Sequence, residues 1–180
     1  MEKNQLLEKQ ISIEKEERIK LEERIHMILT PIELEKRSQN LELHGFSEKE
    51  NENCHTIAKD ILTKITPKQV DVLNCFRTGP KFSYTGERRN RPILIKFATQ
   101  EHREIAFAAR SNLRNLENQV LFLNEHLPPY LKMLRGKANK IRKEKGYKFL
   151  WMKNGNLLVR KNEESNVIGI KNMSDLEKIK

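Results

Sequence analysis

The 180-residue sequence predicts an α+β protein in three parts: an N-terminal coiled-coil helix over residues 1–37, a mixed domain of strands and helices over 38–127, and a small basic α/β domain over 128–180. Three observations predict this organisation. The first part has helical periodicity and no glycine, the second alternates between strand and helix periodicity, and the third carries most of the positive charge.

The first part is predicted to form one helix that self-associates as a coiled coil. Residues 2–29 contain neither glycine nor proline and are mostly Glu, Lys, Leu and Ile. Apolar side chains fit positions a and d of a heptad, except where Glu14 and Arg18 make one heptad polar. A single amphipathic helix packed on its own domain is the alternative. The predicted seam consists of Leu7, Ile11, Leu21, Ile25, Ile28 and Ile32.

A second helix start is indicated near the end of this part. The segment Thr30-Pro31-Ile32-Glu33 has the form of a capping box with proline at the first helical position. We therefore expect the helix either to restart there and run to Arg37, or to kink at the proline.

The middle part predicts four strands and two helices in the order β-α-β-β-α-β. The strands are expected over residues 40–45, 70–76, 92–97 and 119–124, and the helices over 52–65 and 101–113. A polar loop over 81–90 is expected to join the second and third strands. This order is that of the ferredoxin-like fold and of RNA-recognition (RRM-type) domains, a topology that hosts many activities.

The third part predicts a helix followed by a small sheet. Pro128-Pro129 is expected to begin a helix that runs to about Lys145. Residues 147–152 and 157–161 are expected to form a hairpin around an Asn-Gly turn. A short strand over 167–170 and a helical turn over 174–179 follow.

Positive charge is concentrated in the third part. Residues 128–180 hold 14 Lys and Arg against 5 Asp and Glu, a net of +9, whereas 1–39 hold 8 against 9 and 40–127 hold 13 against 11. Such a concentration attracts a polyanion, either nucleic acid or an anionic membrane. We favour nucleic acid, because the apolar side of the basic helix lacks Trp and Phe and is needed for the domain core.

The sequence contains no motif for catalysis or metal binding. P-loop, H-E-x-x-H and G-x-S-x-G motifs are absent, and Cys54 and Cys75 have no His or Cys at ligand spacing. No apolar run approaches about 20 residues, and no signal peptide is recognisable. We therefore expect a non-enzymatic cytoplasmic or nuclear protein with no cofactor and no metal ion, whose two thiols are buried.

Two clusters of basic residues are candidates for phosphate contacts. The first contains seven Arg and two Lys against three acids, and the planar guanidinium suits both phosphate and base stacking. The second lies on the helix predicted after residue 128. Solvated surface charge is the alternative for both. The first cluster is Arg77, Lys81, Arg88, Arg89, Arg91, Lys96, Arg103, Arg110 and Arg114, and the second is Lys132, Arg135, Lys137, Lys140, Arg142, Lys143 and Lys145.

Three aromatic residues alternate on the first strand predicted in the third part. Tyr147, Phe149 and Trp151 therefore share one face of that strand. This face either stacks on bases or forms a small core beneath the basic helix. We expect a core that includes Trp151, with Tyr147 near its rim, where it can contact nucleic acid.

Parts of the sequence resemble two related families. The run from Arg37 to Phe46 (RSQNLELHGF) after a coiled coil, and residues 91–97 (RPILIKF) with Arg103, resemble the first-open-reading-frame proteins of non-LTR retrotransposons. Residues 147–155 (YKFLWMKNG) and 159–163 (VRKNE) are similar to the C-terminal domain of the baculoviral few-polyhedra (FP) protein and its insect retroelement relatives.

The resemblance implies an oligomeric coiled coil, with a trimer favoured, and domains that together coat single-stranded RNA or DNA and act as its chaperone. RRM-type domains carry stacking aromatics where this sequence has Glu42, Pro92 and Leu94, so backbone contact and little sequence preference are expected. An oligomeric scaffold whose basic half docks an acidic protein partner is the alternative function. The contact residues implied by the resemblance are Arg77, Arg88, Arg89, Arg91, Arg103, Arg135, Lys137, Lys140 and Arg160.

Overall fold

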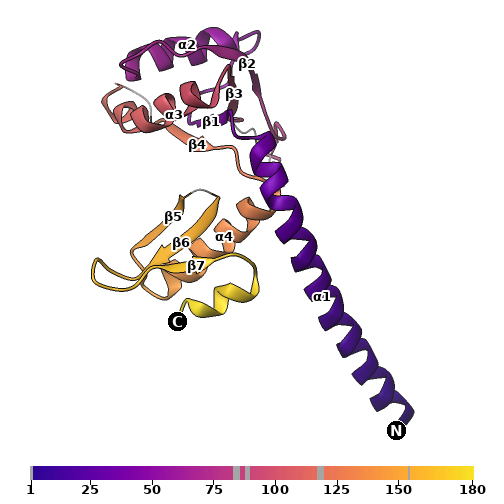
Figure 1. Ribbon diagram of the computed structural model, residues 1–180. Coiled ribbons are helices and arrows are strands. Elements are labelled where there is room, and N and C mark those ends of the chain that lie inside the picture. Colours follow the sequence, from indigo (N-terminus) through magenta and orange to yellow (C-terminus); the bar gives the residue numbers. More distant parts are fainter. Residues whose placement is uncertain (1, 83–85, 88–89, 117–119, 154) are drawn as a thin grey trace. The chain divides into compact units, whose positions relative to one another are not determined.

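The computed structural model describes residues 2–82, 86–87, 90–116, 120–153 and 155–180 (Figure 1). The chain is an α+β protein with a long N-terminal helix and two antiparallel sheets. It divides into two compact units: residues 36–126, called here the central unit, and residues 1–35 with 127–180, called the C-terminal unit. Each unit has its own hydrophobic core. No described helix is both long and apolar enough to cross a membrane.

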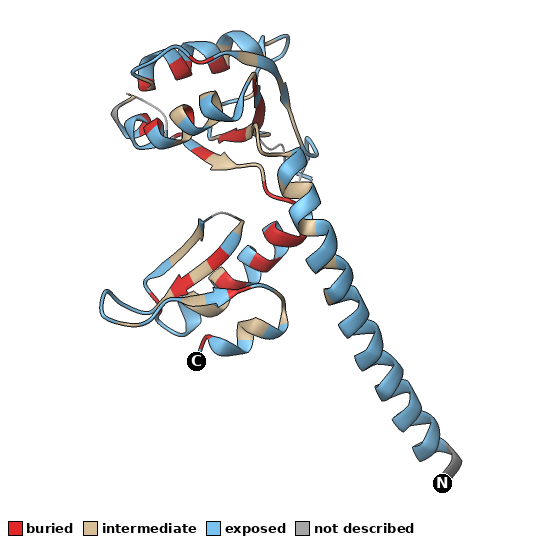
Figure 2. Cartoon of the chain, viewed as in Figure 1, coloured by how far each residue is buried: buried red, intermediate tan, exposed pale blue. Residues whose placement is uncertain are grey.

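Helix α1 (Glu2–Lys36) is one continuous helix. Pro31 lies inside it, so the helix restart considered at Thr30 does not occur. Proline has no amide hydrogen for the carbonyl of Met27, four residues earlier, and the turns on both sides maintain the helix across this one missing bond. Figure 2 shows α1 exposed over nearly its whole length, and the residues of the predicted seam are between 44% and 66% exposed.

In the part of the central unit that the structure describes, four strands and two α-helices follow one another in the order expected from the sequence. Its sheet has the strand order β2-β3-β1-β4 and is antiparallel throughout. The helix predicted over 101–113 is α-helical only to Ala108 and continues as a 3-10 helix. The elements are β1 (Asn40–His44), α2 (Cys54–Ile65), β2 (Val72–Arg77), β3 (Ile93–Phe97), α3 (Gln100–Ala108), the 3-10 helix η1 (Ala109–Asn115) and β4 (Phe122–Glu125).

Local sequence sets where these elements begin and end. Asn53 caps α2 by accepting a hydrogen bond from the Thr56 amide at 3.1 Å, and Thr99 caps α3 in the same way at 3.1 Å from the His102 amide. Gly45 follows β1 with a φ of +92°, where a Cβ atom would collide with the carbonyl oxygen of Val120. Glycine is therefore required for the chain to pass this closely before β4.

Both helices pack on one face of this sheet. Leu41 and Leu43 of β1 and Ile93 and Ile95 of β3 are at most 1% exposed and belong to a single core with the apolar residues of α2 and α3. Because successive strand residues point to opposite faces, the residues between them lie on the face that the helices do not cover. That open face is where an RNA-recognition domain would carry its stacking aromatics.

The C-terminal unit packs α4 on a three-stranded antiparallel sheet of order β5-β6-β7. Leu131, Leu134 and Ala138 of α4 are buried against this sheet at helical spacing. The helix, hairpin and third strand expected from the sequence are all present, and the closing turn is a 3-10 helix. The elements are α4 (Pro129–Glu144), β5 (Phe149–Lys153), β6 (Asn156–Arg160), β7 (Ile168–Ile170) and η2 (Ser174–Lys178).

The C-terminal end of α1 packs within the same unit. The His26 ring stacks on the ring of Tyr130 in α4, with 3.9 Å between centroids. Ser174 donates two hydrogen bonds to Oε1 of Glu23, from its amide at 3.2 Å and from its hydroxyl at 2.8 Å. Leu34 packs against the core of the unit. These contacts join α1 to the rest of the C-terminal unit and leave the predicted seam exposed.

Candidate nucleic-acid interface

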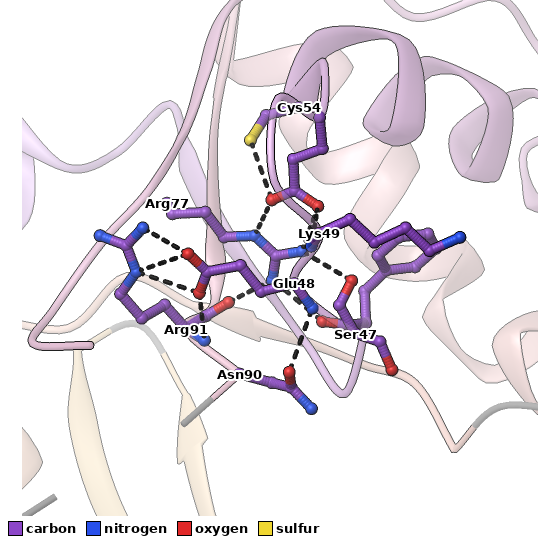
Figure 3. Close-up of polar contacts among 9 residues, drawn as sticks. Ser47, Glu48, Lys49, Cys54, Arg77, Asn90 and Arg91 are labelled. Atoms are coloured by element: carbon purple, nitrogen blue, oxygen red, sulfur yellow. Dashed lines mark hydrogen bonds and ion pairs between the residues drawn. The ribbon is translucent and has the colours of Figure 1, made fainter. Parts of the chain in front are cut away.

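Arg77, the first arginine of the predicted cluster, is bound inside the central unit (Figure 3). Its Nε and Nη2 atoms donate to the two carboxylate oxygens of Glu52 at 2.6 and 3.0 Å. The other N–H groups donate to the carbonyl oxygens of Phe46, Ser47 and Arg91. A guanidinium has five N–H donors, and all five are used here. The Arg77 side chain is 5% exposed, so it cannot reach a phosphate without breaking these bonds.

Arg91 forms a second pair beside it, with Glu48 (Figure 3). Arg91 Nη2 lies 2.5 Å from Glu48 Oε1, and its Nε donates to both carboxylate oxygens at 3.1 and 3.2 Å. The hydrogen bonds from Arg91 lower the pKa of Glu48 to about 2, and those from Arg77 lower the pKa of Glu52. The two pairs join the segment after β1 to the ends of β2 and β3.

The same region holds both cysteines. Cys54 and Cys75 help to line a groove of about 880 Å³ that also contacts Glu48, Glu52 and Arg77. Burial raises the pKa of Cys75 to about 12, and burial together with the Glu52 carboxylate raises the pKa of Cys54. Both thiols are free and only partly buried, whereas the sequence predicted buried thiols, and the raised pKa values disfavour the reactive thiolate. Among the described residues no group of three or more His, Cys, Asp or Glu side chains is arranged to hold a metal ion.

Arg103 is also engaged within the central unit. Its Nη2 donates to Glu125 at 2.8 Å, its guanidinium lies 4.8 Å from the centroid of the Phe107 ring, and its side chain is 15% exposed. Arg88 and Arg89 lie outside the described residues. The exposed members of this cluster are Lys81, Lys96, Arg110 and Arg114.

The open face of the central sheet carries aromatic residues at its edges and none at its centre. Glu42 of β1 occupies the centre beside Leu94 of β3, and is 4% exposed. His44 lies 3.3 Å from the Glu42 carboxylate and His126 3.8 Å from it. Phe76 of β2 and Phe122 of β4, which were not predicted as site residues, are 47% and 56% exposed. In the sequence, their alternation with the core residues of the same strands indicates that these rings lie on the other face of the sheet.

Helix α4 presents the basic residues of the second cluster to solvent. Arg142 is the exception, because it donates hydrogen bonds to Asn139 and to the carbonyl oxygens of Tyr147 and Lys148 at 2.8 to 3.0 Å. Arg142 thus closes the end of α4 onto the chain that follows. The exposed basic residues of α4 and its C-cap that form no ion pair with any described residue are Arg135, Lys137, Lys140, Lys143 and Lys145, called here the α4 basic face.

The prediction of which aromatic residues around β5 are buried is wrong. Tyr147, expected at the rim, precedes β5 and is 8% exposed within the core of the unit. Trp151, expected in the core, lies on the opposite face of β5 from Leu150 and Met152, which pack into that core. Phe149 lies on the same face as Trp151 and is 38% exposed. Arg160 pairs with Phe149 across the hairpin and is only partly buried.

Comparison with known proteins finds a family similarity for the C-terminal segment. Residues 128–180, which contain α4, the three-stranded sheet and η2, match the family model described as Baculovirus FP protein domain 2. This match confirms the resemblance of the third part of the sequence to the baculoviral FP protein. No curated protein matches the chain.

Proposed function

We propose that this protein binds single-stranded nucleic acid with little sequence preference and acts as a chaperone for it. The observation that carries the proposal is the α4 basic face, whose five cationic side chains are exposed and form no ion pair with any described residue. Residues 128–180 have a net charge of +9, so an extended polyanion gains attraction over the whole domain. Contacts of this kind are made to phosphates, which are the same in every sequence.

The arginines of the central unit take a smaller part in this proposal. Arg77, Arg91 and Arg103 hold the unit together through Glu52, Glu48 and Glu125. Breaking a buried pair to free an arginine for phosphate leaves a desolvated carboxylate behind. The exposed Lys81, Lys96, Arg110 and Arg114 remain as weaker phosphate contacts.

We further propose that the central unit is a ferredoxin-like domain of RRM type. Its element order and its antiparallel β2-β3-β1-β4 sheet support the assignment. The centre of its open face holds Glu42 and Leu94 in place of stacking aromatics. Both residues are buried and neither offers an aromatic ring, which favours binding by the basic residues around the unit over base readout on the sheet.

The proposal includes self-association and an origin in a virus or retroelement. The exposed seam of α1 supports a coiled coil, with a trimer favoured by the resemblance to retrotransposon first-open-reading-frame proteins. The match of residues 128–180 to the FP family supports viral ancestry of the C-terminal domain. Several chains joined in this way would place several basic faces along one strand of nucleic acid.

The salt dependence of binding tests the α4 basic face directly. Changing Arg135, Lys137, Lys140 and Lys143 together to Gln should weaken binding to an oligo-U and to a mixed-sequence RNA alike. Each phosphate contact on a single strand contributes about −0.7 to the slope of log K against log salt, so the slope should flatten by roughly 3 units if all four make contact. The matched control changes four other exposed residues, Lys9, Lys20, Lys59 and Lys68, to Gln.

The outcomes separate the proposal from its alternatives. If the control lowers the affinity and the slope as much as the α4 variant, binding reflects net charge and α4 is not the site. Loss of one RNA sequence far more than the other would contradict the sequence-tolerant mechanism. An acidic polypeptide that binds tightly while RNA does not would instead favour the scaffold function.

A further inference from the structure

The sheet of the C-terminal unit has a second face that its core does not use. Residues directly opposite each other in an antiparallel sheet point to the same side. Phe149 pairs with Arg160, and Trp151 pairs with Leu158, which in turn pairs with Gly169. These five residues, called here the outer face, alternate with Leu150, Met152, Leu157 and Val159, which pack into the core beneath α4.

The outer face is apolar and accessible. Phe149 is 38% exposed, and Trp151, Leu158 and Arg160 are partly exposed. None of these four belongs to either hydrophobic core among the described residues. Trp151 is the only tryptophan of the chain, and a ring that large contributes little to stability unless something covers it.

Gly169 makes one side of the outer face flat. The row Trp151–Leu158–Gly169 runs across all three strands and ends without a side chain. A Cβ atom at Gly169 would lie 3.9 Å from Leu158 Cδ2, which is an ordinary contact, so space does not require glycine there. The bare backbone beside Leu158 leaves a strip on which a planar group can lie.

Positive charge borders this strip. Arg160 stands opposite Phe149, and its Nε donates to the carbonyl oxygen of Ser165 at 2.8 Å, which orients the guanidinium and leaves its terminal nitrogens without an ion pair among the described residues. Lys153 lies at the other end of β5 and is exposed. An aromatic strip between cations fits a ligand with flat apolar rings and flanking negative charges.

We propose that the outer face is a stacking platform for the unpaired bases of single-stranded nucleic acid, with Trp151 and Phe149 as the stacking rings. This inference rests on the proposed nucleic-acid binding and adds a base-contacting site to the phosphate-contacting α4 basic face. Every base has an aromatic face, so stacking of this kind does not require sequence preference. A double-stranded ligand, whose bases are already stacked, gains nothing from it.

The test compares a 12-nucleotide oligo-U with an abasic oligonucleotide of the same length, which keeps the phosphates and lacks the bases. The full-length protein should bind oligo-U about 5- to 100-fold more tightly, because stacking on an aromatic side chain contributes that much per base. Oligo-U should quench the emission of Trp151, and the abasic strand should not. Trp151→Ala and Phe149→Ala should each lose most of the preference for oligo-U. Met133→Ala, which removes an exposed apolar side chain of α4, should keep it.

Each outcome of the comparison between oligo-U and the abasic strand supports or overturns the stacking platform. Equal affinity for the two oligonucleotides with unchanged Trp151 emission overturns the platform and leaves phosphate binding intact. Failure of both strands to bind overturns the proposed function itself. A shift of Trp151 emission on dilution without nucleic acid would mean that a second copy of the chain covers the outer face, and the platform would again be overturned. The quenching measurement needs no variant, so a folding defect in Trp151→Ala cannot obscure the result.

Discussion

Arginines that the sequence places in the two basic clusters have different environments in this protein. Arg77 is 5% exposed and has all five donors bound inside the central unit, whereas Arg135 on α4 is exposed and forms no ion pair with described residues. The first therefore contributes to stability and the second is available to a ligand. Replacing either one removes a single positive charge, so the two positions can be compared directly.

Arg77→Ala should destabilise the central unit by about 3–5 kcal/mol, because it leaves the nearly buried Glu52 carboxylate without its partner. Arg135→Ala should change the free energy of unfolding by no more than about 0.5 kcal/mol. Hydrogen exchange at the amides of β1 and β3 measures this for the central unit alone. The double change Arg77→Met with Glu52→Leu should recover most of the loss, and a single Arg77→Ala variant as stable as the parent would contradict the account.

The pH dependence of stability should reveal the Glu48 pair. The pKa of Glu48 falls from its ordinary 4.5 to about 2 in the folded protein through its hydrogen bonds to Arg91. A lowered pKa stabilises the folded state fully above 4.5, and that contribution disappears as the pH falls from about 4.5 to 2. Urea unfolding across this range should therefore be less pH-dependent in Glu48→Gln than in the parent. Glu101→Gln, at an exposed position, should retain the parental profile.

These pairings could not be predicted from the sequence. Glu52 lies 25 residues before Arg77, and Glu48 lies 43 residues before Arg91, so no local spacing relates them. A count of basic residues over 77–114 registers the charges but not the carboxylates that the fold brings against them. The basic residues of α4 have one acid, Glu144, beside them in the sequence, and those of the α4 basic face form no ion pair with described residues. For that reason their exposure was easier to predict from the sequence than that of the central arginines.

At the level of secondary structure, periodicity located the strands but did not decide which face was buried. β5 has apolar residues on both faces, with Phe149 and Trp151 on one and Leu150 and Met152 on the other. Alternation fixes which residues share a face, and here either face could have been core. The pairing with Leu157 and Val159, which the sequence does not reveal, settles the orientation. Tyr147 does not share the face of Phe149 and Trp151 because it lies before the strand begins.

Two glycines that follow strands provide a matched test of the close contact between the chain after β1 and the chain before β4. Gly45 and Gly79 have φ values of +92° and +91°, so Ala at either position costs about 1–2 kcal/mol in backbone strain. At Gly79 nothing lies within 4 Å of the added Cβ, whereas at Gly45 it collides with the Val120 carbonyl. Gly45→Ala should therefore be clearly more destabilising than Gly79→Ala in thermal unfolding. Equal losses would show that the close approach does not constrain the fold.

For the whole molecule, the division of the sequence by charge and periodicity corresponds to different physical roles. The helical first part is nearly neutral and exposes its apolar seam, while the last part holds most of the positive charge. A basic surface that binds phosphates weakly at each contact gains most when several copies act on one strand. The proposed activity therefore requires both the exposed seam of α1 and the α4 basic face.

Self-association should depend on the seam and not on apolar content alone. Changing Ile25 and Ile28 to Asn places amides at adjacent a and d positions, whereas changing Ile13 and Ile19 to Asn makes the same chemical change outside the seam. All four side chains are exposed in the single chain, so neither variant should disturb the folded units. Light scattering at tens of micromolar should give a monomer for the seam variant and an oligomer for the parent and the off-seam variant.

The same pair of variants should separate avidity from intrinsic affinity. An RNA long enough to contact several chains should bind the seam variant more weakly by up to roughly 100-fold, because linked sites bind at high effective concentration. A 12-nucleotide RNA, which one chain can occupy alone, should bind the parent and both variants alike. If the seam variant is monomeric yet binds long RNA as tightly as the parent, oligomerisation serves another purpose. If the parent is itself monomeric, α1 is not a coiled coil under these conditions, and its exposed apolar stripe requires a different partner.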